Sequence, residues 1–219
     1  MTEVLLLRDL IVVVPDADME FAVRSLLSRP ADLGIRPIAF DLWRHVQRDA
    51  GCRSDCHNLL RSGLDKYRYA MVLFDHEGSG RETTTREKLE GEVEKMLQAN
   101  GWQERGTVIV IDPELEAWVW SDSLVVDEVL GWAGRTPPLR PWIKSATEFW
   151  HIGQAKPERP KEAFDAALRQ VGKRHSSSVF EDLAAQVNVE HCIDPAFGKF
   201  KSILQSWFGC KGKKMFRRQ

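Results

Sequence analysis

The sequence has no long hydrophobic segment, few cysteines and little net charge, and each of these absences excludes a class of protein. No apolar run approaches the roughly 18 residues of a membrane-spanning helix, and the opening stretch MTEVLLLRDLIVVVPDAD lacks the basic region and cleavage site of a signal peptide. We therefore expect a cytoplasmic protein. The chain contains 4 cysteines in 219 residues, too few for a disulfide framework, so we expect reduced thiols.

Several motifs of known chemistry are absent as well. The sequence contains neither the G-x-S-x-G turn of serine hydrolases nor the G-x-x-x-x-G-K-[ST] phosphate loop. Cys52, Cys56 and His57 form a C-x3-C-H cluster, but a zinc ion would need a fourth ligand, and Cys192 with His191 is the only obvious supplier. The sequence alone does not decide whether these residues bind zinc.

Four apolar runs alternate with amphipathic segments of helical periodicity. The expected strands are DLIVVV before Pro15, then IRPIAFDLW, YAMVLFD and GTVIVI. Helices are expected from about Asp18, over residues 83–101, and from Asp112, which would be the N-cap with Pro113 as first helical residue. Strands that alternate with helices predict right-handed crossovers and a Rossmann-like α/β fold with a mostly parallel sheet.

The remaining segments set the predicted domain organisation. Pro37 predicts an edge position for the second strand, and residues 49–66 are predicted to form a loop with a short helix. After residue 130 an irregular stretch rich in Pro, Trp and Arg precedes two or three helices. We expect an α/β domain over 1–130, a C-terminal helical extension over 131–208 packed on it, and a basic tail over 209–219.

Charge is unevenly distributed, although the formal net charge is only -1. Acidic residues outnumber basic ones over 75–128, and the reverse holds over 135–219. This asymmetry favours a metal site beside a surface for a polyanion, and it is equally compatible with a merely dipolar protein. The basic residues expected to meet the phosphates of a nucleic acid are Arg135, Arg140, Lys144, Lys156 and Arg159.

Acidic clusters follow three of the predicted strands, at the edge where open parallel sheets bind ligands. They comprise Asp16, Asp18 and Glu20 after the first strand, Asp75 and Glu77 after the third, and Glu114 and Glu116 after the fourth. Mg²⁺ and Mn²⁺ prefer oxygen ligands, so acids that converge from separate strands predict a divalent-metal site. The ordinary alternatives are helix caps after the first strand, turn acids after the third and first-turn helix acids after the fourth.

The layout of these acids resembles the TOPRIM domain of topoisomerases, primases and OLD-type nucleases. That family has an acidic residue, usually Glu, after strand one and a D-x-D pair after strand three, and here VVVPDADMEF and VLFDHEG stand at those places. The chain is more specifically similar to a small TOPRIM-like family of bacterial anti-phage defence loci, including the fourth component of a methylation-associated defence system. Its P-E-x-E-A-W-x-x-x-D element is matched by Pro113, Glu114, Glu116, Ala117, Trp118 and Asp122. With AKPERPKEAF and HCIDPAFGKFKSIL, the resemblance covers roughly residues 8–208.

The resemblance implies a Mg²⁺- or Mn²⁺-dependent phosphodiesterase that acts on DNA or RNA in anti-phage defence, alongside other defence-system proteins. The implied metal ligands are Asp75, Glu77 and Asp16. The implied catalytic residues are Asp16, Asp18, Glu20 and Glu116, with Asp18 or Glu20 as the base toward water and Glu116 supporting a second ion or orienting the first.

Two departures from the family pattern favour an alternative. Val14-Pro15-Asp16 stands where the family usually has Val-Glu-Gly, and the second acidic pair is D-x-E. The family uses the missing glutamate as its general acid or base, so activity could be lost while the fold survives. The alternative is a catalytically inactive TOPRIM-like subunit that binds a partner effector or senses a nucleotide.

Overall fold

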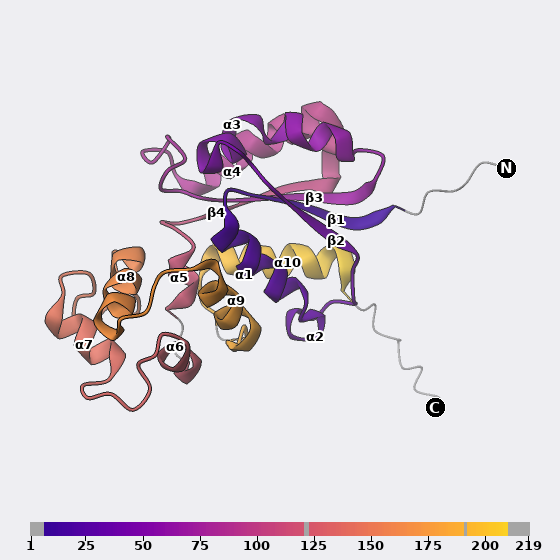
Figure 1. Ribbon diagram of the computed structural model, residues 1–219. Helices are drawn as coiled ribbons and strands as arrows, with labels where there is room; N and C mark the ends of the chain where they lie inside the picture. Colours follow the sequence, from indigo (N-terminus) through magenta and orange to yellow (C-terminus); the bar gives the residue numbers. More distant parts are fainter. Residues whose placement is uncertain (1–6, 121–122, 191, 210–219) are drawn as a thin grey trace, which may run out of the picture.

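A four-stranded parallel sheet organises the computed structural model, which describes residues 7–120, 123–190 and 192–209 (Figure 1). The strand order is β2-β1-β3-β4. The strands are β1 (Arg8–Val14), β2 (Phe40–Arg44), β3 (Tyr67–Asp75) and β4 (Gly106–Ile111). The predicted α/β class with a parallel, Rossmann-like sheet is confirmed, and β2 lies at an edge as Pro37 indicated.

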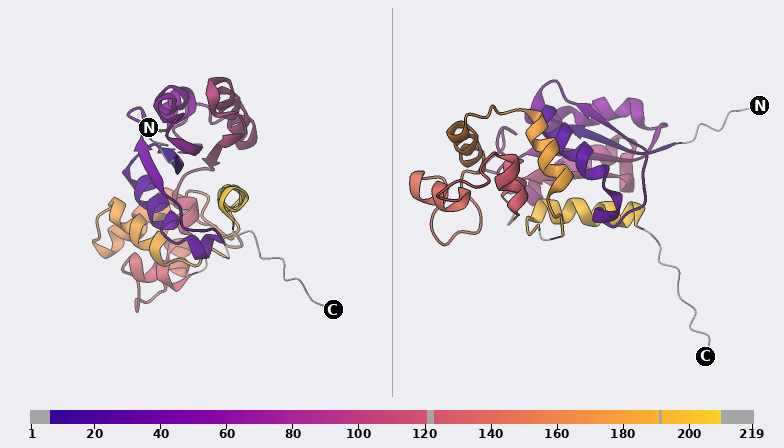
Figure 2. Two further views of the ribbon diagram at one scale, coloured as in Figure 1. Left: turned by 90° about the vertical axis from the view of Figure 1, so that its right-hand side faces the viewer. Right: turned by 60° about the horizontal axis from the view of Figure 1, so that its bottom comes forward.

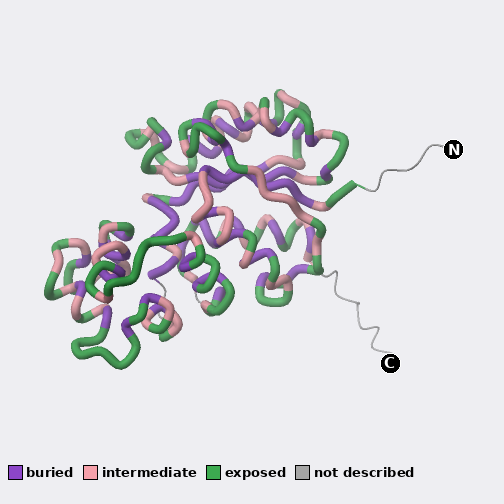
Figure 3. The backbone as a smooth tube through the Cα atoms, viewed as in Figure 1, coloured by how far each residue is buried: buried purple, intermediate pink, exposed green. Residues whose placement is uncertain are grey.

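The two central strands are buried on both faces, which explains their unbroken apolar sequences (Figure 3). Side chains alternate between the faces, so Val12 and Met71 belong to one core cluster whereas Ile11 and Val72 belong to the other. Because the chain winds from β1 outward to β2 and then returns to β3, the winding direction reverses between β1 and β3. The crevice at such a switch point is where open α/β sheets bind ligands.

One face of the sheet is covered by α3 (Arg48–Leu60) and α4 (Arg86–Leu97), with the short helical turns η1 (Arg61–Gly63), η2 (Gln98–Trp102) and η3 (Gln103–Arg105). Residues 49–66 were predicted to form a loop with a short helix; the helix is present but begins already at Arg48, so the loop part of this prediction is wrong. The buried side of α3 includes Gly51, Cys52 and Cys56 as well as Leu60. Glycine and cysteine do not form a recognisable apolar stripe, so the sequence periodicity of this helix is weak.

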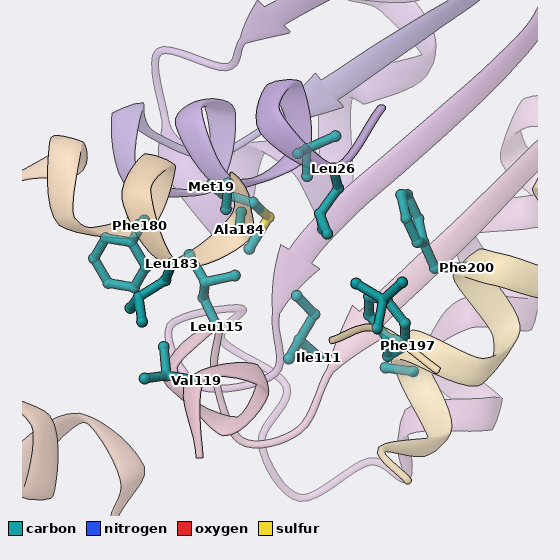
Figure 4. Close-up of a cluster of buried hydrophobic side chains, with 14 of the residues drawn as sticks. Met19, Leu26, Ile111, Leu115, Val119, Phe180, Leu183, Ala184, Phe197 and Phe200 are labelled. Atoms are coloured by element: carbon teal, nitrogen blue, oxygen red, sulfur yellow. The ribbon is translucent and has the colours of Figure 1, made fainter. Parts of the chain in front are cut away.

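The opposite face is covered by α1 (Ala17–Leu27), α2 (Pro30–Leu33), α9 (Ser177–Gln186) and α10 (Pro195–Phe208). Figure 4 shows how Met19 and Leu26 of α1 face Leu183 of α9, and how Phe197 and Phe200 of α10 complete the same cluster. The helices that follow residue 160 therefore share one hydrophobic core with the sheet.

Four further helices lie beyond the carboxyl ends of the strands or beside them: α5 (Glu116–Val119), α6 (Leu124–Val129), α7 (Leu139–Ala146) and α8 (Pro160–Val171) (Figures 1 and 2). The predicted helix start at Asp112 is wrong, because Asp112 and Pro113 form a turn with a cis peptide bond and α5 begins at Glu116. Of the predicted basic tail over 209–219, all but Gly209 falls outside the described residues. Within those residues, no helix combines the length and apolarity needed to cross a bilayer.

Carboxylates from α4 close the outer edge of β4. Glu90 Oε1 accepts a hydrogen bond from the Val110 backbone N–H at 3.0 Å, and Glu94 Oε1 accepts one from Val108 at 3.1 Å. Lys199 Nζ of α10 lies 3.0 Å from both carboxylates. We call Glu90, Glu94 and Lys199 the edge lock, because they satisfy strand N–H groups that would otherwise be open to pairing with another strand.

Candidate functional site

Five carboxyl groups meet at the edge of the sheet where β1, β3 and β4 end. We call them the acidic rim, which consists of Asp16, Asp49, Asp75, Glu114 and Glu116. Asp16 follows β1, Asp49 lies in the first turn of α3, Asp75 is the last residue of β3, and the two glutamates follow β4. The acidic rim lies at the switch point between β1 and β3.

Asp75 is the centre of the acidic rim. Its Oδ1 atom is buried and has no hydrogen-bond partner, while its backbone N–H donates to Asp49 Oδ1 at 2.9 Å. Burial raises the pKa of Asp75 well above its usual value, and the nearby carboxyls of Asp49, Glu116, Asp16 and Glu114 raise it further. A buried acceptor without a donor is costly, so this oxygen requires a proton or a cation to be satisfied.

The turn after β4 carries two more buried carboxyls. Glu114 and Glu116 are each 4% exposed. Burial, followed by repulsion from Glu114, raises the pKa of Glu116 to about 7. Burial also raises the pKa of Glu114, although the Lys161 backbone N–H donates to its Oε1 at 3.0 Å. Glu116 therefore exchanges its proton close to neutral pH.

Lys161, in the first turn of α8, brings a positive charge to the acidic rim. Its Nζ lies 3.8 Å from Glu114 Oε2. Burial lowers the pKa of Lys161, but Glu116, Glu114, Asp75 and Asp165 outweigh burial and raise it. Lys161 is therefore a stable ammonium group, and it offsets only part of the charge that the five carboxyls would carry if all were ionised.

The predicted site residues after β1 lie in different places in the structure. Asp16 reaches the acidic rim, and it also caps α1 through Oδ1, which accepts a hydrogen bond from Met19 N–H at 3.1 Å. Asp18 instead binds His175 Nε2 at 3.0 Å and the Ser177 hydroxyl.

Glu20 and Glu77 also lie outside the acidic rim. Glu20 forms ion pairs with Arg24 at 2.8 Å and Arg44 at 3.1 Å. Glu77 is exposed and donates its backbone N–H to Pro113 O at 3.0 Å, and its charge contributes to the raised pKa of Glu114. Of the predicted acids, those brought together are thus Asp16, Asp75, Glu114 and Glu116, and Glu77 lies at their margin.

The acidic rim is not a preassembled metal site. In the part of the chain that the structure describes, no group of three or more His, Cys, Asp and Glu side chains is arranged to hold a metal ion. The chemistry of the donor set nevertheless fits a hard divalent cation, because the acidic rim offers carboxylate oxygens and an unpartnered Asp75 Oδ1. Binding would require the carboxyls to lose protons and move closer together.

Sequence reasoning missed Asp49 and Lys161. Asp49 was missed because the start of α3 was predicted as part of a loop, although the segment that follows β2 begins at the same edge of the parallel sheet. Lys161 could not have been found from local patterns, since its position depends on how α8 packs against α5.

Three of the five predicted phosphate-binding residues line one cavity, and the other two are not among its lining residues. Arg140, Lys144 and Lys156 line a cavity of about 430 Å³ together with Trp118, Trp120 and Trp150. Lys156 Nζ donates to Ala117 O at 2.7 Å and to Asp194 at 3.2 Å, and Arg140 pairs with Asp127 at 3.1 Å. Two residues lie apart from this cavity: the Arg135 guanidinium is 5.7 Å from the Trp132 ring centroid, and Arg159 pairs with Glu162.

The cysteines of the possible zinc cluster lie within the core. Cys52 and Cys56 are both buried on α3. Burial raises the pKa of Cys56 to about 12 and raises that of Cys52 as well, which disfavours the thiolates that zinc requires. His191, a suggested distant ligand, lies outside the described residues, as does Asp122 of the matched P-E-x-E-A-W-x-x-x-D element.

Comparisons with protein-family models, with curated proteins and with solved structures yield no significant match to this chain. The functional interpretation therefore depends on the residues and geometry of the site and on the motif resemblance described above.

Proposed function

We propose that this chain is a Mg²⁺- or Mn²⁺-dependent phosphodiesterase with a TOPRIM-like fold, acting on nucleic acid in bacterial anti-phage defence. The observation that carries the proposal is the buried, unpartnered Oδ1 of Asp75 at the centre of the acidic rim. Structural carboxylates are normally hydrogen-bonded, and a carboxylate without a donor among four others favours a cation site. The choice of nucleic acid and of defence comes from the motif resemblance.

The acidic rim supplies the residues that would hold the ion. Asp75 and Asp16 are the proposed ligands from the two central strands, with Asp49 and Glu116 as neighbours able to complete the set and Glu77 at the margin. When bound, Mg²⁺ supplies Lewis-acid stabilisation of the charge that develops on a phosphoryl group. The ion would also replace the proton that the raised pKa keeps on Asp75.

Glu116 and Lys161 have the properties of groups that act on the substrate. A carboxyl with a pKa of about 7 takes up and releases protons near neutral pH, which suits a base for the attacking water and an acid for the departing oxygen. The Lys161 ammonium group lies beside Glu114 and can attract a phosphate oxygen. We assign Glu116, rather than Asp18 or Glu20, the proton-transfer role, because ion pairs and hydrogen bonds occupy the other two.

The alternative function is a catalytically inactive TOPRIM-like subunit that binds a partner effector or senses a nucleotide. The absence, within the described ranges, of a preassembled group of metal ligands favours this alternative. So do the occupied carboxylates of Asp18 and Glu20, which stand near the position of the family's missing glutamate.

Cleavage assays separate these two functions. Purified protein is incubated with plasmid, single-stranded DNA and RNA in Mg²⁺, Mn²⁺ or EDTA. We expect metal-dependent cleavage that falls at least about 100-fold in Asp75→Asn, because the substitution removes a charged ligand. Asp55→Asn makes the same change at a side chain that is 48% exposed on α3, so it is the matched control. Failure of the wild-type protein to cut any substrate, with defence in cells unaffected by Asp75→Asn, would reject the enzyme.

Calorimetric titration with Mn²⁺ tests the ion site without relying on turnover. Because the ion competes with protons on carboxyls whose pKa values are raised, we expect tighter binding at about pH 8 than at about pH 6. Asp75→Asn should abolish the heat of binding, and Asp55→Asn should leave it unchanged. Binding that is equally tight in Asp75→Asn would place the ion elsewhere.

A further inference from the structure

A groove of about 870 Å³ opens beside the acidic rim, where β1 and β2 end. Its walls come from the start of α1, the end of β2 and the beginning of α3, and Asp16 belongs to both the groove and the acidic rim. The volume lies in the upper part of the range of about 300–1,000 Å³ that is typical of ligand sites.

Some charged side chains that line this groove have an ionic partner in the described part of the chain, and others do not. Glu20 pairs with Arg24 and Arg44, and Asp18 is bound by His175. The exposed guanidinium of Arg48 lines the groove, and among the described residues it forms no ion pair or hydrogen bond. Arg48 is therefore a cation available to a ligand, directly adjacent in sequence to Asp49 of the acidic rim.

The backbone holds Arg48 in an unusual conformation. Its φ angle is 51°, in the left-handed region that non-glycine residues seldom adopt. The preceding turn is fixed by His45, whose Nδ1 accepts the Gln47 backbone N–H at 3.2 Å. His45 also packs so closely on Gly51 that a Cβ there would lie 2.1 Å from its ring. Strained residues of this kind occur preferentially at ligand-binding sites.

We propose that this groove binds a single strand of nucleic acid and leads its phosphodiester backbone to the acidic rim. Arg48 would contact a phosphate, with Arg44 beside it, and the half-buried Trp43 ring in the same wall would contact a base. This inference rests on the proposed function, because it takes the substrate to be a nucleic acid. It places the substrate on the β2 side of the acidic rim, away from the basic residues selected from the second half of the sequence.

The test measures binding in EDTA, so that it is independent of the metal and of cleavage. Fluorescence anisotropy follows labelled oligo-dT and oligo-U of about 12 nucleotides, a length within the usual site sizes for single strands. We expect Arg48→Ala to weaken binding about tenfold at low salt. The slope of log K against log salt should become shallower by about 0.7, the value for loss of one phosphate contact on a single strand. Arg48→Lys should retain most of the affinity and all of the slope.

Three further variants exclude a purely structural effect. Arg61→Ala removes an exposed arginine just beyond the far end of α3 and should leave affinity unchanged. Glu20→Gln removes the acid paired with Arg44 and should tighten binding about threefold, consistent with the small energies of exposed ion pairs. Arg48→Gly tolerates the positive φ, so it should melt no lower than the wild-type protein while binding as weakly as Arg48→Ala.

The outcomes distinguish this inference from the proposed function. If the wild-type protein binds neither oligonucleotide, or if Arg48→Ala and Arg61→Ala bind equally, the groove does not bind the strand, even if the protein cuts nucleic acid. If binding depends on Arg48 and no cleavage occurs with any metal, the groove inference stands and the enzyme is rejected. Asp75→Asn should lose cleavage and keep binding. The relative affinities for oligo-dT and oligo-U assign the class of strand.

Discussion

The acidic rim and the edge lock are two sets of carboxylates in one small fold, and they differ in how their oxygens are satisfied. In the edge lock, Glu90 accepts from a strand N–H and from Lys199, and Glu94 does the same. In the acidic rim, Asp75 Oδ1 has no donor, and its nearest charged neighbours are other acids.

This difference separates carboxylates that stabilise the fold from carboxylates that lack donors for their oxygens. A buried charge is tolerated when hydrogen bonds and an opposite charge accompany it, as in the edge lock. Carboxyls that repel one another lower the stability of the folded state, and such an arrangement is typical of functional sites. Opposite effects of mutation on stability are therefore expected in the two sets.

The largest expected effect is the loss of the edge lock. Glu90→Ala leaves the Val110 N–H without an acceptor and removes one partner of Lys199. We expect the free energy of unfolding to fall by about 3–5 kcal/mol, the usual cost of breaking a buried charged pair. Urea denaturation measures this change in the free energy of unfolding.

Glu87→Ala is the matched control for the edge lock. It makes the same truncation on α4 at a side chain that is 69% exposed. Its effect should stay below about 1 kcal/mol, as for other exposed ion pairs. Equal losses in the two variants would mean that the edge lock contributes nothing beyond ordinary surface interactions.

The second prediction is that a substitution in the acidic rim raises the free energy of unfolding, whereas the substitution in the edge lock lowers it. The pKa of Glu116 is raised from 4.5 to about 7 in the folded chain. Its contribution to stability is therefore fully present below the unfolded pKa and is lost as pH rises through about 7. In EDTA, Glu116→Gln should be more stable than the wild-type protein by about 2–3 kcal/mol at pH 8 and nearly equal to it at about pH 4.5.

Parallel urea titrations at both pH values measure this difference. Glu104→Gln, at an exposed residue of the turn before β4, should behave like the wild-type protein at both. A Glu116→Gln variant that is less stable at pH 8 would show that the Glu116 carboxylate is satisfied in the fold, and the contrast between the two sets would disappear.

The sequence predicted the elements of the fold whose apolar residues form a regular pattern. The buried strands β1, β3 and β4 were identifiable from their long apolar runs, and the amphipathic pattern identified α1, α4 and the helices after residue 160. The first part of helix α3 was missed because Gly51, Cys52 and Cys56 take the place of large apolar residues on its buried side. Asp49 was missed with it.

The site was predictable to the extent that it follows from strand ends. Asp16, Asp75 and Glu116 come directly after strands or the turn that follows one, so parallel topology brings them together. The separation of Asp18 and Glu20 from the acidic rim was not predictable, because it depends on His175 and Arg44 from distant segments. Hydrogen-bond satisfaction of individual oxygens, which distinguishes the edge lock from the acidic rim, is a property of tertiary packing alone.

The smallest expected effect concerns His175, which holds Asp18 away from the acidic rim. Its ring nitrogens lie 3.0 Å from Asp18 Oδ2 and 2.8 Å from Asp165 Oδ1, so both must donate, and the imidazolium form is favoured. Burial lowers the pKa of His175, but these two carboxylates outweigh burial and raise it above 6.5. The stabilising contribution is thus fully present below pH 6.5 and is lost as pH rises through the raised value. Because the side chain is 33% exposed, we expect it to contribute less than about 1 kcal/mol to the free energy of unfolding.

The difference in melting temperature between the wild-type protein and His175→Gln should shrink from about pH 6 to about pH 9. A constant difference across that range would mean that the ring is neutral and donates to only one of the two carboxylates.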